Sequence, residues 1–370
     1  MYEVRQEINL KTIRENFLNI QNYVGNKTEV IPVIKADAYG HGASAVALAL
    51  KEFVKNYFAV ACTEEAVELR KNHIDTNIIV LSRAGFGDIE DLYNYNLTPV
   101  VHGFSVLQDI IDFAKNKKYR FPIHIKFNTG MNRVGFNQLD LEKIVELYKK
   151  NKDYIDIVGI MSHFSNSESD IKQTTQQLNI FEEIIKSIKS YGIDPRYYHI
   201  SNSGAILNYR SSHFNAVRAG IALYGYYPKK QKDNSMNIKP AMSIKSFIIS
   251  KHYLKKGEGI SYGPSFVANC DMQVAIVAFG YADGLFRLMS NKFGVIVNDK
   301  LCKSIGTICM DMFAVDVSDV DVKVGDEVII MGKSKTCMVD ADDLALVSST
   351  INYEILTNIG KSLRVKRVYV

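Results

Sequence analysis

The chain has 370 residues, 47% of them hydrophobic, which is enough for one large domain and a smaller one with a real core. Its 45 basic and 40 acidic residues leave a net charge of +5, a mild excess spread along the sequence that gives little support for a nucleic-acid partner. No apolar run reaches the eighteen or so residues of a membrane span, the start is charged, and the five cysteines form no CxxC pair. We therefore expect a cytoplasmic globular protein without a membrane segment or a metal site.

One pattern recurs from about residue 28 to residue 225. A short apolar, β-branched run ends in polar residues, and a stretch with helical periodicity follows it. The predicted strands are 30–34, 57–62, 77–82, 98–102, 121–127, 155–161, 197–201 and 215–220. Continuous apolar strands indicate burial on both faces, as in a parallel sheet. Eight units without a GxGxxG turn after the first strand favour a (β/α)₈ TIM-like barrel over an open doubly wound sheet.

The pattern changes after about residue 235. Strand-like runs are now separated by Gly, Asn and Asp turns, and helical periodicity is weak before the late segment ADDLALVSST. This predicts a second, mainly β domain over 236–370. We place the boundary in the segment YYPKKQKDNSMN (226–237), so that the barrel ends at about residue 235.

Basic and polar side chains follow many of the predicted barrel strands. The carboxyl ends of barrel strands form the active face in this kind of fold. For any single residue, a charge that only marks where a strand leaves the core is an equally good interpretation. Several cations at one mouth nevertheless favour an anionic ligand such as a phosphate or a carboxylate. The strand-end residues are Lys35, Arg83, His102, Lys126, Asn128, His163, Ser201 to Ser203 and Arg218.

Lys35 is the sharpest of these candidates, because it ends an almost continuous apolar strand. A partly desolvated lysine has a lowered pKa, and its free amine can form a Schiff base. Backbone amides of NSG (202–204) and RAGIA (218–222), with Ser203 and Tyr39, could cradle a phosphate. A lysine imine beside a phosphate cradle suggests pyridoxal 5′-phosphate (PLP), whose ring is an electron sink. Composition and spacing do not distinguish PLP from a sugar phosphate.

The segment VIKADAYGHG (33–42) resembles the PLP-lysine motif of alanine racemases. The resemblance covers essentially the whole chain, because KFNTGMNRVG, SHF, SNSG, VRAGIALYG, GISYG, GYADG, GTICMD and INYE follow in the family's order and spacing. It implies a PLP-binding barrel and a β domain that the first ten residues join, giving a barrel over 11–235 and a β domain over 236–370 with 1–10. It also implies a homodimer whose active sites combine one subunit's barrel with the other's β domain.

The resemblance implies two catalytic bases. Lys35 would hold PLP and exchange the α-proton on the D face, and Tyr262, delivered from the partner subunit, would be the base on the L face. Two bases on opposite faces of a planar carbanion are what racemisation requires. Arg133 matches the residue beside this tyrosine that also reaches the substrate carboxylate. Met310 would add a backbone N–H from the partner, although core packing is the ordinary interpretation of a methionine.

Cofactor contacts are implied in the same way. Arg218 matches the residue at the pyridine nitrogen, to which a guanidinium can only donate a hydrogen bond. His163 matches the residue beside the ring, with a hydrogen-bonded core histidine as the ordinary alternative. Lys126 matches a lysine often carbamylated in this family, where the new carboxylate orients the arginine. The positions that match phosphate contacts are Tyr39, Ser203, Gly220, Ile221 and Tyr353.

Two segments depart from the family pattern. Asn128 stands where Asp is usual, and HFSNSES (163–169) replaces the acidic pattern HFAxADE. Tyr353 is retained, which favours alanine over serine, because related serine racemases replace this bulky residue.

We therefore predict a PLP-dependent alanine racemase that supplies D-alanine for peptidoglycan. The alternatives are a serine or broad-specificity racemase and, in another class, a non-catalytic PLP carrier. The β domain with Tyr262 argues against the carrier, and GISYG and GTICMD argue against a decarboxylase of the same barrel type.

Overall fold

The computed structural model describes residues 2–229 and 235–370, so residues 230–234 of the predicted boundary segment lie outside the described residues. The chain divides into two compact units. The barrel unit comprises Arg14–Ala38 and Gly42–Ile238. The β unit comprises Met1–Ile13, Tyr39–His41 and Lys239–Val370. The β unit is therefore discontinuous in sequence, and the barrel unit is inserted into it.

The barrel unit contains eight parallel strands. Strands β3 to β8 form a six-stranded sheet in sequence order, and β2 pairs with β9. The two sheets are joined on one side by the bridge between Val33 and Ala59, and on the other by the N–H of Arg218, which donates to the Ser201 carbonyl at 3.0 Å. The predicted (β/α)₈ barrel is confirmed. Its strands are β2 (Glu29–Pro32), β3 (Tyr57–Cys62), β4 (Asn77–Arg83), β5 (Thr98–Val101), β6 (Phe121–Lys126), β7 (Ile155–Met161), β8 (Tyr197–His199) and β9 (Ala216–Ala219).

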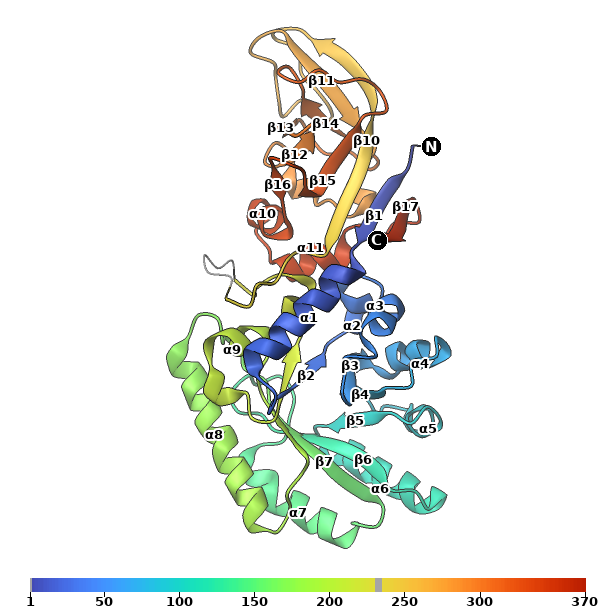
Figure 1. Ribbon diagram of the computed structural model, residues 1–370, viewed down its shortest axis with the longest axis vertical. Coiled ribbons are helices and arrows are strands. Elements are labelled where there is room, and N and C mark those ends of the chain that lie inside the picture. Colours follow the sequence, from blue (N-terminus) through green and yellow to red (C-terminus); the bar gives the residue numbers. More distant parts are fainter. Residues whose placement is uncertain (1, 230–234) are drawn as a thin grey trace. The chain divides into compact units, whose positions relative to one another are not determined.

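These strands are buried on both faces, as their continuous apolar character predicts; every residue of β2, β5 and β9 is buried. Helices connect them and lie outside the strands in Figure 1. In the longest, α8 (Ile171–Ser190), the Asp170 carboxylate caps the first turn by accepting the Gln173 N–H at 2.9 Å. The remaining helices of this unit are α3 (Ala43–Leu50), α4 (Thr63–Lys71), α5 (Ile89–Asn94), α6 (Phe104–Lys117), α7 (Leu141–Lys150) and α9 (Ser203–Asn208), while α1 (Leu10–Val24) spans the division between the units.

The β unit is built on a nine-stranded sheet in the order β16-β15-β12-β13-β14-β11-β10-β1-β17. The long strand β10 (Met242–Leu254) pairs with β1 and β15 through its first half and with β11 through its second half. Strand β1 (Val4–Ile8) lies between β10 and the parallel strand β17 (Val365–Tyr369). The other elements are β11 (Met272–Val277), β12 (Gly294–Val297), β13 (Lys300–Ile305), β14 (Phe313–Asp316), β15 (Glu327–Lys333), β16 (Met338–Val339), α10 (Ala341–Val347) and α11 (Asn352–Asn358). A mainly β second domain is thus confirmed.

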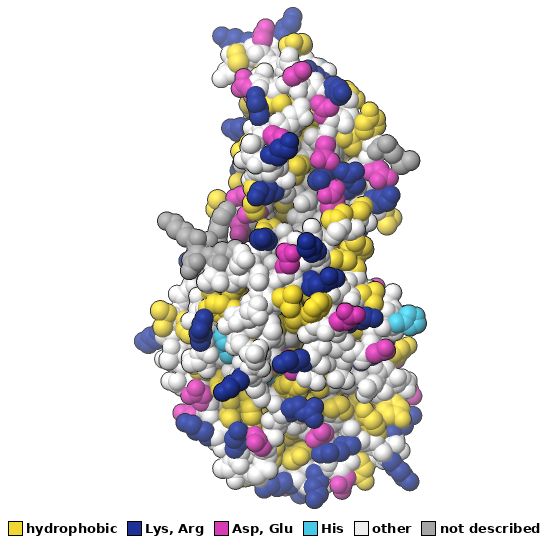
Figure 2. All heavy atoms as spheres, viewed as in Figure 1, with side chains coloured by type: hydrophobic (Ala, Val, Ile, Leu, Met, Phe, Trp, Pro, Cys, Tyr) yellow, Lys and Arg dark blue, Asp and Glu magenta, His cyan; other side chains and the backbone are white. Residues whose placement is uncertain are grey.

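Charged side chains of both signs are interspersed over the face shown in Figure 2. This agrees with the small net charge of +5 and gives no single-sign patch on that face. In the described part of the chain, no helix combines the length and apolarity that crossing a membrane requires.

Candidate active site

A left-handed turn follows Lys35. Ala36, Asp37, Ala38 and Tyr39 have φ between 52° and 54°, a conformation that costs a non-glycine residue about 1–2 kcal/mol. Side-chain acceptors hold the turn: Glu65 Oε1 accepts the Ala36 N–H at 2.7 Å, and Asp37 Oδ1 accepts the Ala43 N–H at 2.8 Å. Four successive residues in this region are rare outside functional sites, because the surrounding structure must impose them. The turn therefore fixes the position of the backbone at Lys35, and with it the position from which the Lys35 side chain extends.

The surroundings of Lys35 favour its neutral amine. Burial lowers the pKa of Lys35 below its usual value, and the cations Arg133 and Arg218 lower it further. Glu65 acts in the opposite direction. Its carboxylate, however, is shared between two backbone donors, the N–H of Ala36 and that of Ala61, each at 2.7 Å. Lys35 is therefore prepared to act as an amine nucleophile or as a base.

Lys126 lies at the end of β6 and is 5% exposed. Burial lowers its pKa to about 8, and the other groups that lower it are the cations Arg218, Arg133 and Lys35. Four of the predicted cations at strand ends and in loops therefore interact electrostatically with one another. They are Lys35, Lys126, Arg133 and Arg218. The other two make different contacts: Arg83 pairs with Glu64 at the surface, and His102 Nε2 donates to the Ser82 carbonyl at 3.0 Å while the ring stacks on Phe86.

Arg218, in β9, is a buried guanidinium that is 3% exposed. Its Nη1 donates to His199 Nδ1 at 2.8 Å and to the His199 carbonyl at 3.0 Å. Its Nη2 donates to the Ser162 carbonyl at 2.8 Å and to the Ile200 carbonyl and His163 Nδ1, both at 3.0 Å. Within residues 2–229 and 235–370 no acceptor is bonded to Nε–H. One donor of this rigidly held group therefore remains for a ligand.

Arg218 also sets the tautomers of the histidines around it. Because a guanidinium only donates, Nδ1 of His199 must accept, and the proton sits on Nε2, which donates to His124 Nδ1 at 2.8 Å. Burial, reinforced by the Arg218 charge, holds the pKa of His163 and His199 well below the usual range. Burial likewise lowers the pKa of His124 to about 3. None of the three rings therefore adds a positive charge beside Arg218, whose own pKa burial lowers to about 9.

Backbone and hydroxyl groups converge at the start of α9. The Ser203 hydroxyl oxygen accepts the N–H of Gly220 at 3.1 Å and the N–H of Ala222 at 3.2 Å. Asn202 caps the helix, because its Oδ1 accepts the Ala205 N–H at 3.1 Å. Ile221 lies between the two donors, at the start of a short 3₁₀ helix (Ile221–Tyr224). This set of small groups and N–H donors suits a phosphate.

In the β unit, three glycine-bearing loops lie together. Thr307 Oγ1 donates to the Tyr262 carbonyl at 2.9 Å, and the Ala282 N–H donates to the Met310 carbonyl at 3.0 Å. Gly280 is required here, because a Cβ atom would lie 2.2 Å from the Met310 oxygen. The side chains of Tyr262 and Met310 are 73% and 53% exposed. Both predicted site residues thus come from one loop cluster and face away from the core of their unit.

Tyr39 and Tyr353 also belong to the β unit. Their ring centroids are 6.0 Å apart, with 49° between the ring planes. Two positions that match phosphate contacts, one near the start of the chain and the other near its end, are therefore neighbours in space. The pairing brings the end of the left-handed turn next to helix α11 within this unit.

Three participating residues were missed by the sequence reasoning: Glu65, His124 and His199. A usable signal existed for the two histidines. His124 precedes Lys126 by two positions, and His199 precedes Ser201 by two, so each pair is expected on one side of its predicted strand. No such signal marked Glu65, since an acidic residue in the first turn of a helix is common.

A lysine that loses its proton easily, near donors suited to a phosphate, defines a barrel enzyme that captures a carbonyl cofactor through an amine. The chain belongs to the alanine racemase family. Residues 8–228 match the family model "Alanine racemase, N-terminal domain", and residues 241–369 match "Alanine racemase, C-terminal domain".

Relatives and solved structures agree with this membership. Alanine racemase 1 of Clostridium acetobutylicum is 40% identical over 368 residues, which cover 98% of this chain and 94% of the relative. The alanine racemase structure from Clostridium difficile 630 has a TM-score of 0.92 at 36% identity, covering all of this chain and 96% of that one. The Bartonella henselae alanine racemase, solved with covalently bound pyridoxal phosphate, has a TM-score of 0.90 at 28% identity, and the match covers 100% of both chains.

Proposed function

We propose that the protein is a PLP-dependent racemase that interconverts L-alanine and D-alanine by a two-base mechanism. Family membership and curated alanine racemases of near-equal length support the reaction. The observation that carries the chemistry is the position of Lys35 at the start of the left-handed turn, where burial and neighbouring cations lower its pKa. The residues present fit PLP, because an amine nucleophile and a set of phosphate-type donors occur in one barrel unit.

When bound, PLP supplies an aldehyde that captures amino groups and a ring that accepts the electron pair released at the α-carbon. The Ser203 hydroxyl and the backbone at Gly220 and Ile221 would hold the phosphate, together with the hydroxyls of Tyr39 and Tyr353. Arg218 would direct its remaining Nε–H to the pyridine nitrogen. Since Arg218 has no proton to give up at neutral pH, this nitrogen would stay unprotonated. His163, kept neutral by burial and by the Arg218 charge, would pack beside the ring.

Two bases, one on each face of the substrate's α-carbon, would remove and return the α-proton. Lys35 Nζ would take or return the proton on the D face, which requires the neutral amine that its lowered pKa provides. The partner subunit's Tyr262 would do so on the L face. Arg133 and the backbone N–H of the partner subunit's Met310 would bind the substrate carboxylate. The exposure of the Tyr262 and Met310 side chains within their own unit supports a homodimer with shared sites.

The wider role follows from the product. D-alanine is a building block of peptidoglycan, and we propose that the enzyme works in the cytoplasm to supply it, without a nucleic-acid or membrane partner. The domain assignment proposed with this function is a PLP-binding barrel over 11–235 and a β domain over 236–370 that residues 1–10 join.

We further propose that Lys126 is carbamylated and that its carbamate orients Arg133. The pKa of Lys126, lowered from 10.5 to about 8, raises its neutral fraction at pH 7.5 from about 0.1% to about a quarter. Only the neutral amine reacts with carbon dioxide, and the negative carbamate would sit among cations. After incubation with ¹³C-bicarbonate at pH 8, NMR should show one carbamate signal per chain, which weakens as the pH falls below the lowered pKa.

The Lys126→Ala variant should lack this signal, whereas Lys55→Ala, which removes an exposed lysine, should keep it. No carbamate signal in the wild-type protein at pH 8, or an undiminished signal in Lys126→Ala, would contradict the assignment.

A racemase for serine or for a broader set of amino acids remains the second candidate reaction, and a non-catalytic PLP carrier is the candidate from another class. Exchange of the α-proton in deuterated water separates all three. We expect deuterium incorporation into both enantiomers of alanine at rates at least about tenfold above those for serine, because the bulky Tyr353, which related serine racemases replace, would narrow the substrate pocket. Mass spectrometry of each amino acid, started from each enantiomer, measures the rates. Faster exchange of serine would support the second reaction, and no exchange at all would support the carrier.

A further inference from the structure

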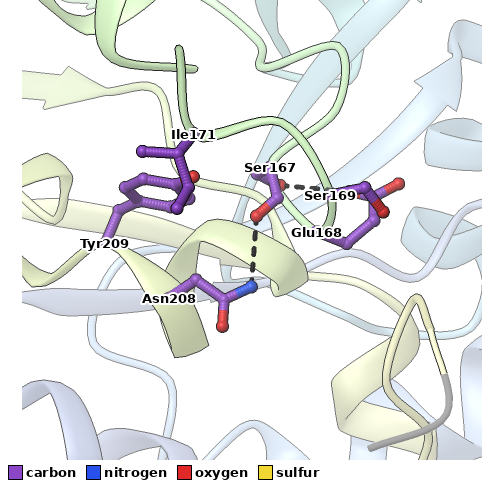
Figure 3. A pocket seen from close by; sticks show the side chains of 6 residues that line it. All are labelled: Ser167, Glu168, Ser169, Ile171, Asn208 and Tyr209. Carbon is purple, nitrogen blue, oxygen red and sulfur yellow. Dashed lines mark hydrogen bonds between the residues drawn. The ribbon is translucent and has the colours of Figure 1, made fainter. Parts of the chain in front are cut away.

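The segment that departs from the family pattern, Ser165 to Asp170, is tied to two helices of the barrel unit. The backbone N–H and the hydroxyl of Ser165 both donate to Gln177 Oε1 of α8, at 3.0 and 2.9 Å. On the other side, Asn208 Nδ2 of α9 donates to the Ser167 carbonyl at 3.1 Å, as Figure 3 shows. The segment therefore bridges α8 and α9.

Ser167 makes the central contact of this segment. Its side chain is 1% exposed, and its hydroxyl donates to Asn202 Oδ1 at 2.7 Å. The alternative acceptor, Glu168 Oε2, lies at 3.4 Å, which is too long to compete for the single hydroxyl proton. Asn202 Oδ1 also accepts the Ala205 N–H, which fixes the orientation of this amide. In the pattern HFAxADE that the resemblance implies for this segment, the position of Ser167 is an alanine, which has no hydroxyl.

The contact between this segment and α9 is close. A Cβ atom on Gly204 would lie 2.6 Å from the Ser167 hydroxyl oxygen and 3.3 Å from Glu168 Oε2. Next to this contact is an open cavity of about 560 Å³, lined by Ser167, Glu168, Ser169, Ile171, Asn208 and Tyr209 (Figure 3). Because one side of the segment faces this cavity, its position depends on its hydrogen bonds to α8, to α9 and to Asn202.

We propose that Ser167 is a positioning residue for the cofactor phosphate, acting through Asn202 on the start of α9. Asn202 immediately precedes Ser203, whose hydroxyl oxygen accepts hydrogen bonds from the N–H groups of Gly220 and Ala222. A second hydrogen bond to Asn202 Oδ1 restricts the helix cap and with it the Ser203 hydroxyl. A donor group that is already in place loses less freedom on binding, so the affinity for the phosphate rises. The inference rests on the proposed function, because it takes this set of donors as the PLP phosphate site.

The test compares PLP with pyridoxal, which has the same aldehyde but lacks the phosphate. Dissociation constants are measured by titrating the cofactor-free protein with each compound and recording absorbance. Ser167→Ala should raise the dissociation constant for PLP about 5- to 10-fold, the effect of one buried hydrogen bond, and leave that for pyridoxal within about twofold. Ser169→Ala, an exposed serine of the same segment, should change neither.

A double-mutant cycle tests the route through Asn202. Asn202→Ala should weaken PLP binding at least as much as Ser167→Ala, and the double variant should be no weaker than Asn202→Ala alone. Strictly additive effects would overturn the proposal, as would an equal loss of affinity for PLP and pyridoxal in Ser167→Ala. An unchanged PLP affinity in Ser167→Ala, with a clear loss in Ser203→Ala, would overturn the positioning role alone. If Ser203→Ala left the affinity for PLP unchanged, the result would instead contradict the phosphate site and the proposed function on which this inference rests.

Discussion

Replacing Lys35 by alanine is expected to lower the racemisation rate by at least about 10⁴-fold, because one side chain supplies both the amine that captures PLP and a base. The absorbance of the lysine-bound cofactor should disappear at the same time. Borohydride reduction followed by peptide mass spectrometry should find the cofactor on Lys35 in the wild-type protein and on no peptide of the variant. Racemisation in both directions is measured by chiral chromatography.

The matched control is Lys55→Ala, which removes an exposed lysine from the same unit. It should keep the activity and the absorbance of the wild-type protein. A reducible bond between the cofactor and another lysine in the Lys35→Ala variant, with activity retained, would show that the amine nucleophile lies elsewhere.

Replacing Tyr262 by phenylalanine is expected to separate the two faces of the reaction. Racemisation should fall by about 10²- to 10⁴-fold, the usual contribution of a positioned acid or base. Exchange of the α-proton of D-alanine in deuterated water should continue, because Lys35 is intact, whereas exchange starting from L-alanine should nearly stop. Equal loss of exchange from both enantiomers would contradict the assignment of Tyr262 to one face.

The proposed placement of Tyr262 in the partner subunit has its own test. In a mixed dimer of Lys35→Ala and Tyr262→Ala subunits, one of the two sites combines a wild-type Lys35 with a wild-type Tyr262. Random exchange of equal amounts should therefore restore about a quarter of the wild-type activity. Either variant mixed with itself should restore none. If subunit exchange is demonstrated by mass spectrometry and no activity returns, the site is not shared between subunits.

Much of the barrel could be predicted from local sequence. A strand that is buried on both faces must be apolar along its whole length, so β2 to β9 are visible as runs such as VIPVI and YFAVAC. Lys35 could be recognised as a candidate for the same reason, because a charged side chain directly after a buried apolar strand is unusual. The loops of the β unit were found through resemblance, because short strands and glycine turns alone do not say which loops meet.

Other parts of the site depend on contacts between residues far apart in sequence. The segment Ala36–Tyr39 contains alanines that favour a right-handed helix, yet it is left-handed. Glu65 accepts the Ala36 N–H at its start, and the Asp37 carboxylate accepts the Ala43 N–H beyond its end. Burial, reinforced by the Arg218 charge, keeps His199 neutral, and the hydrogen bond from Arg218, 19 residues away in the chain, sets its tautomer. Such outcomes require the assembled barrel, since neither an intrinsic preference nor a motif specifies them.

The position of strand β1 has a consequence for synthesis on the ribosome. Its partners in the sheet are β10 and β17, so Val4–Ile8 emerges long before either partner exists. At about 5–20 residues per second, the roughly 230 residues up to β10 take about 10 to 50 s to make. All eight barrel strands appear in that interval. The nascent chain therefore carries β1 as an unpaired strand, and the charges of Arg5 and Glu7 would discourage its pairing with other nascent chains.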